Sequence, residues 1–191
     1  MNEIKEYENY KDRIIIADAT PLVHLCRIGK IDYLRRLFSN IYSTETVKNE
    51  FLKYLTKDQF PNWINIEQPT KNMINIHIHK RTDDGERSAI ALALFKEAEE
   101  EKRGGNKKSA LILDDKNARI YLKEKNINNI DTIGTLKILN FAFEQKYFSF
   151  NDIQVIFDDL TVNKSNFRAK KSDINIIYNG DYLKIKKGKK I

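Results

Sequence analysis

Short apolar runs alternate along the chain with longer segments in which apolar positions recur every three or four residues. Two of the runs, 14–17 and 110–113, are almost entirely aliphatic, as is typical of strands buried on both faces of a sheet. Strands that alternate with helices predict a mainly parallel sheet with helices on both faces. The other predicted elements are strands at 41–42 and 129–133, and helices at 21–29, 31–38, 45–55, 82–100, 117–125 and 136–145.

Turn and capping residues mark several of these boundaries. Thr20 is the predicted N-cap of the first helix, because Pro21 is favoured at a first helical position, and Thr44 is the predicted cap of the helix at 45–55. Residues 63–66 and 73–78 alternate with period two, which predicts extended segments near a sheet edge.

The length of 191 residues is consistent with one domain and a substantial core. Cys26 is the sole cysteine and cannot form an internal disulfide. No apolar stretch approaches the roughly 20 residues that span a bilayer, and the polar, acidic start is unlike a signal peptide. We therefore expect a cytoplasmic protein with no membrane association.

The positive charge is concentrated at the carboxyl end of the chain. From Lys164 onward there are nine Lys or Arg residues and two acids, so this segment carries the entire net charge of +7. Such a segment attracts polyanions, and nucleic acid is the first expectation. For residues 184–190, a solvated Lys-rich tail is an equally good explanation.

Carboxylates follow the two most apolar runs directly. Asp18 comes after residues 14–17, and the pair Asp114 and Asp115 comes after residues 110–113. Ligands of open α/β sheets bind at the carboxyl ends of the strands. Several acids at one edge repel each other, so the pattern favours a cation among them. The alternative is that each Asp forms backbone hydrogen bonds in an ordinary turn.

Glu50 and Glu86 lie at the apolar edges of two predicted helices between these runs. Glu86 shares a helical face with Ala89 and Ile90, where an unpaired buried carboxylate would cost several kcal/mol. A capping box with Asp83 explains Glu86 as well, and a surface glutamate explains Glu50. Oxygen ligands without a Cys or His cluster favour Mg²⁺ or Mn²⁺, and a carboxylate-bound ion of this kind is suited to phosphoryl transfer.

Five segments follow one another in a recognisable order, at 15–23, 47–50, 84–93, 111–119 and 133–136. In these segments the chain resembles the PIN-domain superfamily, in particular its prokaryotic branch with Asp-x-Gly-Glu and Asp-Asp-x-x-Ala-Arg signatures. The resemblance implies a three-layer α/β/α fold over 14–148, preceded by a polar lead-in at 1–13 and followed by a basic extension at 149–191. It also implies a Mg²⁺- or Mn²⁺-dependent endoribonuclease, in many relatives the toxin of a toxin–antitoxin pair.

Carried over by position, the resemblance makes Asp18, Glu50, Glu86 and Asp114 the metal ligands, with Asp115 an additional or substitute catalytic acid. An RNA substrate, a protein antitoxin and a homodimer are the expected partners. The alternative is a non-catalytic module with a degenerate site that binds nucleic acid or a regulatory partner. The candidate nucleic-acid contacts are Thr20, Lys116, Arg119, Lys170 and Lys171.

Overall fold

A five-stranded parallel sheet with the order β3-β2-β1-β4-β5 forms the centre of the computed structural model. The structure describes residues 6–76, 82–127, 129–149, 152 and 155–156. The strands are β1 (Ile14–Ala17), β2 (Ile41–Ser43), β3 (Asn65–Ile66), β4 (Ser109–Ile112) and β5 (Asp131–Ile133). The predicted three-layer α/β/α fold is confirmed.

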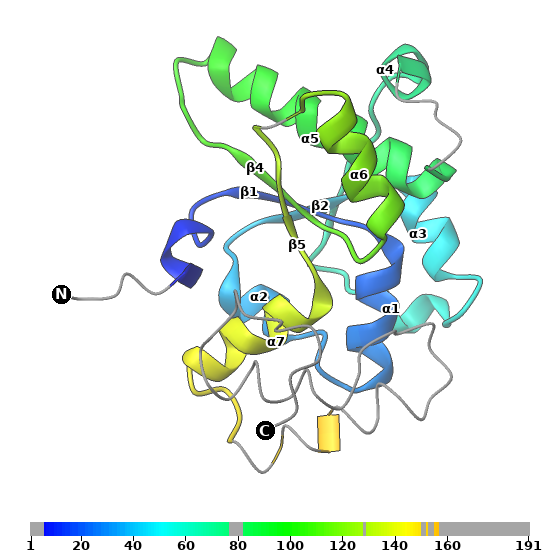
Figure 1. Cartoon of the computed structure of the whole chain (residues 1–191). Coiled ribbons are helices and arrows are strands. Elements are labelled where there is room, and N and C mark those ends of the chain that lie inside the picture. The colour runs from blue at the N-terminus through cyan, green and yellow to red at the C-terminus, as the bar shows by residue number, and fades with distance from the viewer. Residues whose placement is uncertain (1–5, 77–81, 128, 150–151, 153–154, 157–191) are drawn as a thin grey trace, which may run out of the picture.

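Helices cover both faces of this sheet (Figure 1). One layer contains α5 and α6, and the opposite layer contains α1, α2 and α7. The α-helices are α1 (Ala19–Arg27), α2 (Tyr33–Leu37), α3 (Glu45–Phe51), α4 (Lys71–Ile76), α5 (Asp84–Lys102), α6 (Lys116–Glu124) and α7 (Thr135–Glu144), and the short 3-10 helices are η1 (Glu6–Asn9) and η2 (Lys57–Gln59).

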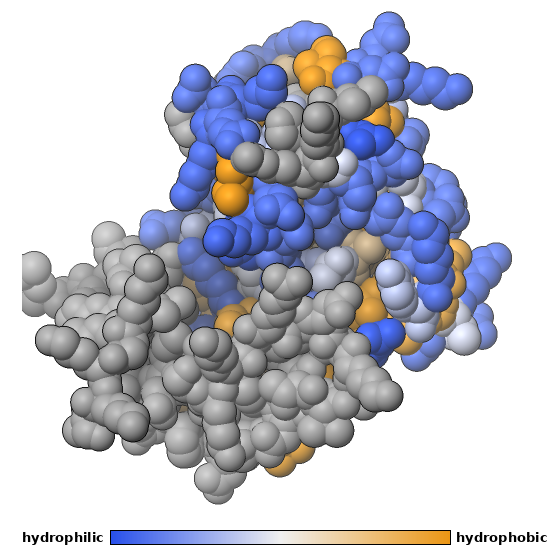
Figure 2. Space-filling view, turned by 45° about the vertical axis from the view of Figure 1, so that its right-hand side comes forward, coloured by the Kyte–Doolittle hydropathy of each residue, from blue (hydrophilic) through white to orange (hydrophobic). Residues whose placement is uncertain are grey.

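The two strands at the middle of the sheet form the core, as their apolar runs predict. Ile15 and Ile16 of β1 and Leu111 and Ile112 of β4 are completely buried, because both faces of these strands are covered by helices. Figure 2 shows that the described surface in that view is mostly hydrophilic, with small separate apolar patches. No helix in the described part of the chain is long and apolar enough to cross a membrane.

The prediction that Thr20 caps the first helix is wrong. Asp18 is the N-cap of α1: its backbone is extended, and its side chain accepts a hydrogen bond from the Thr20 amide. The helix begins directly after β1, so the exposed Thr20 is already its second residue. The predicted cap at Thr44 is confirmed, because its hydroxyl accepts from the amide of Val47 at 3.1 Å.

The extended segment predicted at 73–78 is also wrong where the structure describes it, because residues 71–76 form α4. Thr70 begins this helix: its hydroxyl accepts from the Met73 amide and its carbonyl from the Ile74 amide. Met73 and Ile74 are half-buried where α4 packs on α5. In such a short segment, a local cap and tertiary packing outweigh an apparent period of two.

A buried carboxylate fixes the C-terminal half of α5 against the sheet. Glu97 is 3% exposed. One of its oxygens accepts from the Ser109 amide at 2.6 Å, and the other accepts from the side chain of Asn129. Ser109 also donates its hydroxyl to the carbonyl of Ala93. Helix α5 is therefore tied to the first residue of β4 and to the segment that leads into β5.

Candidate metal centre

The strand order creates a topological switch point between β1 and β4. From β1 the chain continues to β2 on one side, and from β4 it continues to β5 on the other side. Ala17 pairs with Ile112 at the carboxyl ends of the two strands, and the Asp18 amide donates to the Ile112 carbonyl at 3.0 Å. Asp18, Asp114 and Asp115 thus emerge at the edge where open α/β sheets bind ligands.

Helices α3 and α5 bring the two glutamates to this edge. The buried hydroxyls of Thr44 and Ser88 are 2.7 Å apart and join the start of α3 to the start of α5. The Gly85 amide donates to Glu50 Oε1 at 3.1 Å. A Cβ atom on residue 85 would lie 2.1 Å from the other carboxylate oxygen of Glu50. The absence of a side chain at Gly85 therefore permits this close approach.

Asp83 and Glu86 form a capping box at the start of α5, as one of the two interpretations of Glu86 predicted. Asp83 Oδ1 accepts from the Glu86 amide at 2.9 Å, and Glu86 Oε2 accepts from the Asp83 amide at 3.0 Å. Glu86 is nonetheless buried, while Asp83 is exposed. The box consequently holds one carboxylate inside the site and a second at its rim.

Five carboxylates act on one another electrostatically at this edge, and we call them the acid cluster: Asp18, Glu50, Asp83, Glu86 and Asp115. Asp84 also acts on Glu50, but it forms an ion pair with Arg87 and is not counted in the cluster. Burial, followed by the charges of Asp83 and Glu50, raises the pKa of Asp18 to about 7. Burial, followed by the charges of Asp83, Asp18 and Asp115, raises the pKa of Glu86 to about 8. Burial and then Asp83 also raise the pKa of Glu50. Negative charge is therefore unfavourable here unless a cation compensates it.

The clearest sign of such a cation is an oxygen of Asp18. The side chain is 3% exposed, and its Oδ1 is buried without a hydrogen-bond partner among the described residues. A buried polar atom without a partner costs about 1–3 kcal/mol, and more when it is charged. The cluster offers only carboxylate oxygens, which suit Mg²⁺ or Mn²⁺. The residues present thus fit a hard divalent ion.

The acids are not already arranged as a coordination shell. Within the described residues, no three Asp, Glu, His or Cys side chains form a group that could hold an ion as they stand. Glu50 and Glu86 instead accept hydrogen bonds from the amides of Gly85 and Asp83. Side-chain rotations at the start of α5 would accompany coordination.

Asp114 has a different environment from the acid cluster. Its Oδ1 accepts from the Thr135 amide at 2.8 Å, and its Oδ2 accepts from the Thr135 hydroxyl at 2.6 Å and from His24 Nδ1 at 3.1 Å. These hydrogen bonds outweigh burial, which on its own raises the pKa of Asp114, and the net result is a lowered pKa. Asp115 instead caps α6, with Oδ1 accepting from the amides of Asn117 and Ala118.

The predicted nucleic-acid contacts that the structure describes differ in their exposure. Thr20 and Lys116 are exposed at the first turns of α1 and α6, which both begin at the carboxyl edge. Arg119 is partly turned inward: its guanidinium donates to the Leu113 carbonyl and lies 4.0 Å from Asp114. Lys170 and Lys171 lie outside the described residues.

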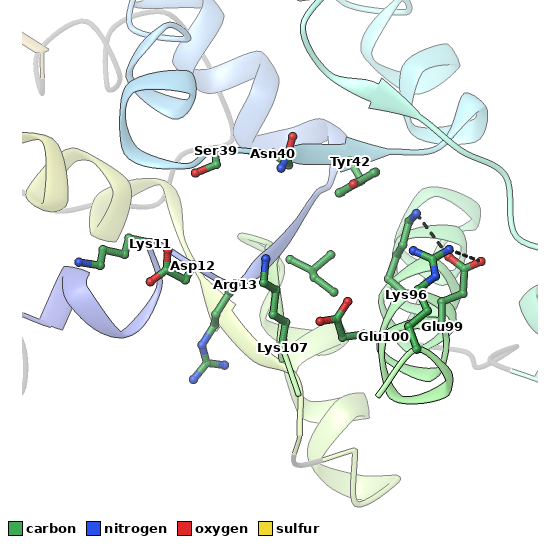
Figure 3. Close-up of a pocket in the computed structure, with 12 residues that line it drawn as sticks. Lys11, Asp12, Arg13, Ser39, Asn40, Tyr42, Lys96, Glu99, Glu100 and Lys107 are labelled. Atoms are coloured by element: carbon green, nitrogen blue, oxygen red, sulfur yellow. Dashed lines mark ion pairs between the residues drawn. The ribbon is translucent and has the colours of Figure 1, made fainter. Parts of the chain in front are cut away.

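A pocket of about 160 Å³ lies at the opposite edge of the sheet, between the amino ends of β1 and β2 and the C-terminal half of α5 (Figure 3). Two of the cations that line it, Lys96 and Arg13, lie beside acids. Lys96 lies 2.6 Å from Glu67 and 3.5 Å from Glu99, and Arg13 lies 2.8 Å from Asp131. Cations outnumber acids among the residues that line this pocket, so it does not favour a bound cation, and the carboxyl edge is the candidate metal centre.

The molecule is an α/β/α protein with a parallel sheet, and its acids lie near one another at the topological switch point. Proteins of this class bind ligands at that point. A family model described as a PIN domain matches residues 14–179, and the chain therefore belongs to the PIN-domain family, which has a nuclease-type fold. No curated protein and no solved structure shows significant similarity to the chain.

Two residues of this region were not predicted as functional from the sequence. Asp83 was interpreted only as a helix cap, although its charge acts on three other acids of the cluster. Its position beside the Gly-Glu pair was the available signal. His24 lies in an apolar run and gave no signal, because its partner Asp114 is 90 residues away in the chain.

Proposed function

We propose that this protein is a Mg²⁺- or Mn²⁺-dependent endoribonuclease whose metal centre is the acid cluster. Asp18, Glu50 and Glu86 would hold the ion, together with a carboxylate from the turn between β4 and α6. The observation that carries the proposal is the buried Oδ1 of Asp18, which lacks a hydrogen-bond partner among the described residues. Membership in the PIN-domain family supports the same reaction class.

The bound ion would supply charge neutralisation at the phosphodiester and a lowered pKa for water. The chain's own groups set the conditions for binding it. Asp18 and Glu86 retain protons near neutral pH, with pKa values of about 7 and 8, so both must lose protons as they take up the ion. Gly85 permits the approach of the Glu50 carboxylate to the start of α5.

RNA is the proposed substrate class. The net charge of +7, all of it carried by the segment after residue 163, supports binding of a polyanion. We further propose that the protein acts in the cytoplasm, that it is the toxin of a toxin–antitoxin pair and that a protein antitoxin controls it, as in many PIN-domain proteins. A homodimer is part of the same proposal.

RNA cleavage by purified wild type and by Asp18→Asn tests the activity. Asparagine keeps the size of the side chain and is itself a good N-cap, so the variant should fold. We expect cleavage to fall by more than the roughly 10–100-fold typical of residues that only orient metal ligands. Asp32→Asn is the matched control, because the side chain of Asp32 is 51% exposed at the start of α2 and pairs there only with Arg35 within the described chain. Equal cleavage by wild type and Asp18→Asn would refute the assignment.

EDTA distinguishes the second candidate function, a non-catalytic nucleic-acid-binding module. The nuclease should lose cleavage in EDTA and regain it with Mn²⁺. A binding module would instead show salt-sensitive RNA binding that is indifferent to EDTA, with no cleavage under any condition.

A further inference from the structure

Asp114 connects three elements that are far apart in the sequence. It follows β4, and its carboxylate accepts one hydrogen bond from His24 on α1 and two from Thr135, the first residue of α7. A carboxylate only accepts hydrogen bonds, so Nδ1 of the buried His24 carries the hydrogen in this contact. Thr135 is completely buried. Three hydrogen bonds already engage both oxygens of Asp114.

Helix α7 explains why a carboxylate is needed at this position. Its N-cap residue is Gly134, which has no side chain to accept a hydrogen bond from the first turn. The Thr135 amide donates to Asp114 instead, at 2.8 Å. Negative charge at a helix N-terminus is stabilising. Asp114 thus supplies, from another element, the cap that α7 lacks.

Gly134 also makes room for this arrangement. A Cβ atom at residue 134 would lie 3.2 Å from Asp114 Oδ1 and 2.8 Å from an Arg119 nitrogen. Both are closer than ordinary van der Waals contact, so a side chain here would push Asp114 and Arg119 away. The missing cap and the close approach of Asp114 therefore have the same cause, a glycine at residue 134.

Asp115 differs from Asp114 because only one of its two carboxylate oxygens accepts hydrogen bonds within the described chain. Both of its hydrogen bonds within the described chain go to Oδ1, from the amides of Asn117 and Ala118. Because adjacent residues in a turn point in different directions, holding Asp114 toward α7 turns Asp115 away from it, and its Oδ2 stays without a hydrogen bond within the described chain at the carboxyl edge.

We infer that Asp115 is the carboxylate of this turn that serves the ion, and that His24 and Thr135 are positioning residues which hold Asp114 as the cap of α7. This inference rests on the proposed function for the role of Asp115. The cap itself is independent of any activity.

The experiment compares Asp114→Asn, Asp115→Asn, His24→Leu and Thr135→Val by metal-free thermal melting and by Mn²⁺ calorimetry below each melting temperature. Asp114→Asn, His24→Leu and Thr135→Val should each lower the melting temperature, and their effects should be non-additive in double variants because they break one network. His24→Asn, which restores a donor near the position of Nδ1, should recover part of the loss. In NMR spectra of the wild type, the His24 ring should be the Nδ1–H tautomer.

The metal readout separates the two aspartates. Asp115→Asn keeps an N-cap side chain for α6, and we expect its Mn²⁺ affinity to fall by at least about tenfold. The affinity of folded Asp114→Asn should stay within about threefold of wild type, a change smaller than those seen at residues that orient metal ligands. A large loss in Asp114→Asn with none in Asp115→Asn would overturn the inference. If wild type binds no Mn²⁺, the proposed function fails, and the melting temperatures alone test the cap. Non-additive losses of melting temperature in the double variants would support the cap, and additive losses would refute it.

Discussion

Replacing Asp18 with asparagine should stabilise the metal-free protein at pH 8 and leave its stability almost unchanged at pH 4. The side chain is 3% exposed and lies beside other acids, so its ionised form is costly without a cation. Asparagine has the same shape, carries no charge and can still cap α1. The substitution therefore removes the charge while keeping the fold.

The magnitude follows from the pKa of Asp18. Burial and the neighbouring acids raise it from 3.8 to about 7. Between these pH values the native protein keeps a proton that the unfolded chain has lost, so the free energy of unfolding falls as pH rises through this window. At about 1.4 kcal/mol for each tenfold change in the protonation equilibrium, the full effect approaches about 4 kcal/mol. Most of it should be present by pH 8.

Urea unfolding in EDTA at several pH values between 4 and 8.5 measures this difference. Glu86, whose pKa is raised to about 8, lowers the stability of both proteins as pH rises. The informative quantity is therefore the free energy of unfolding of Asp18→Asn minus that of wild type. Asp32→Asn serves as the control, because this half-exposed aspartate lies outside the acid cluster.

The difference between Asp18→Asn and wild type should grow as pH rises and should disappear when Mn²⁺ is added in excess, because the ion stabilises only the wild type. Parallel pH profiles for the two proteins in EDTA would refute the reasoning. They would mean that Asp18 is ionised at no cost in the metal-free protein, and the case for a cation at its buried oxygen would be lost.

Three further predictions concern the same edge of the sheet and the core beneath it. Gly85→Ala should fold, since alanine is favoured over glycine in helices by roughly 1 kcal/mol, but its Cβ would displace the Glu50 carboxylate. Calorimetry should therefore show about a tenfold loss of Mn²⁺ affinity. Unchanged affinity would contradict the role given to the glycine. In wild type, Mn²⁺ affinity should rise from pH 6 to pH 8, because the ion must displace protons from groups with pKa values of about 7 and 8; a flat profile in the same titration would contradict this. Phe51→Ala, at a completely buried position, should lower the free energy of unfolding by about 3–5 kcal/mol, whereas Tyr54→Ala, at a position 63% exposed, should change it by less than about 0.5 kcal/mol.

The fold could be predicted from the sequence because its signals are local and repeated. The runs at 14–17 and 110–113 became β1 and most of β4, since uninterrupted aliphatic residues suit strands covered on both faces. Segments with weaker local signals were predicted less well. α4 has only six residues, and its start depends on Thr70 and on packing against α5.

The candidate site could be predicted only in part, because its details depend on contacts between distant residues. Asp18 was recognisable from its place after an apolar strand. The different environments of Asp114 and Asp115 were not, because they depend on a histidine of α1 and on a glycine at the start of α7 that cannot cap its own helix. The capping box at Asp83 and Glu86 was predicted, but the effect of Asp83 on the other acids required their positions in space.

The hydrogen bond between Glu97 and the first residue of β4 has a consequence for the position of Glu86. Three of the nine buried residues of α5 are alanines, and such small side chains interlock less with the sheet than larger ones do. The hydrogen bond of Glu97 restrains the helix along its axis at a point about 16 Å from Glu86, at 1.5 Å per residue. Losing the Glu97 hydrogen bonds would leave the contacts of the first turn, such as that between Thr44 and Ser88, as the main restraint on the axial position of the Glu86 carboxylate.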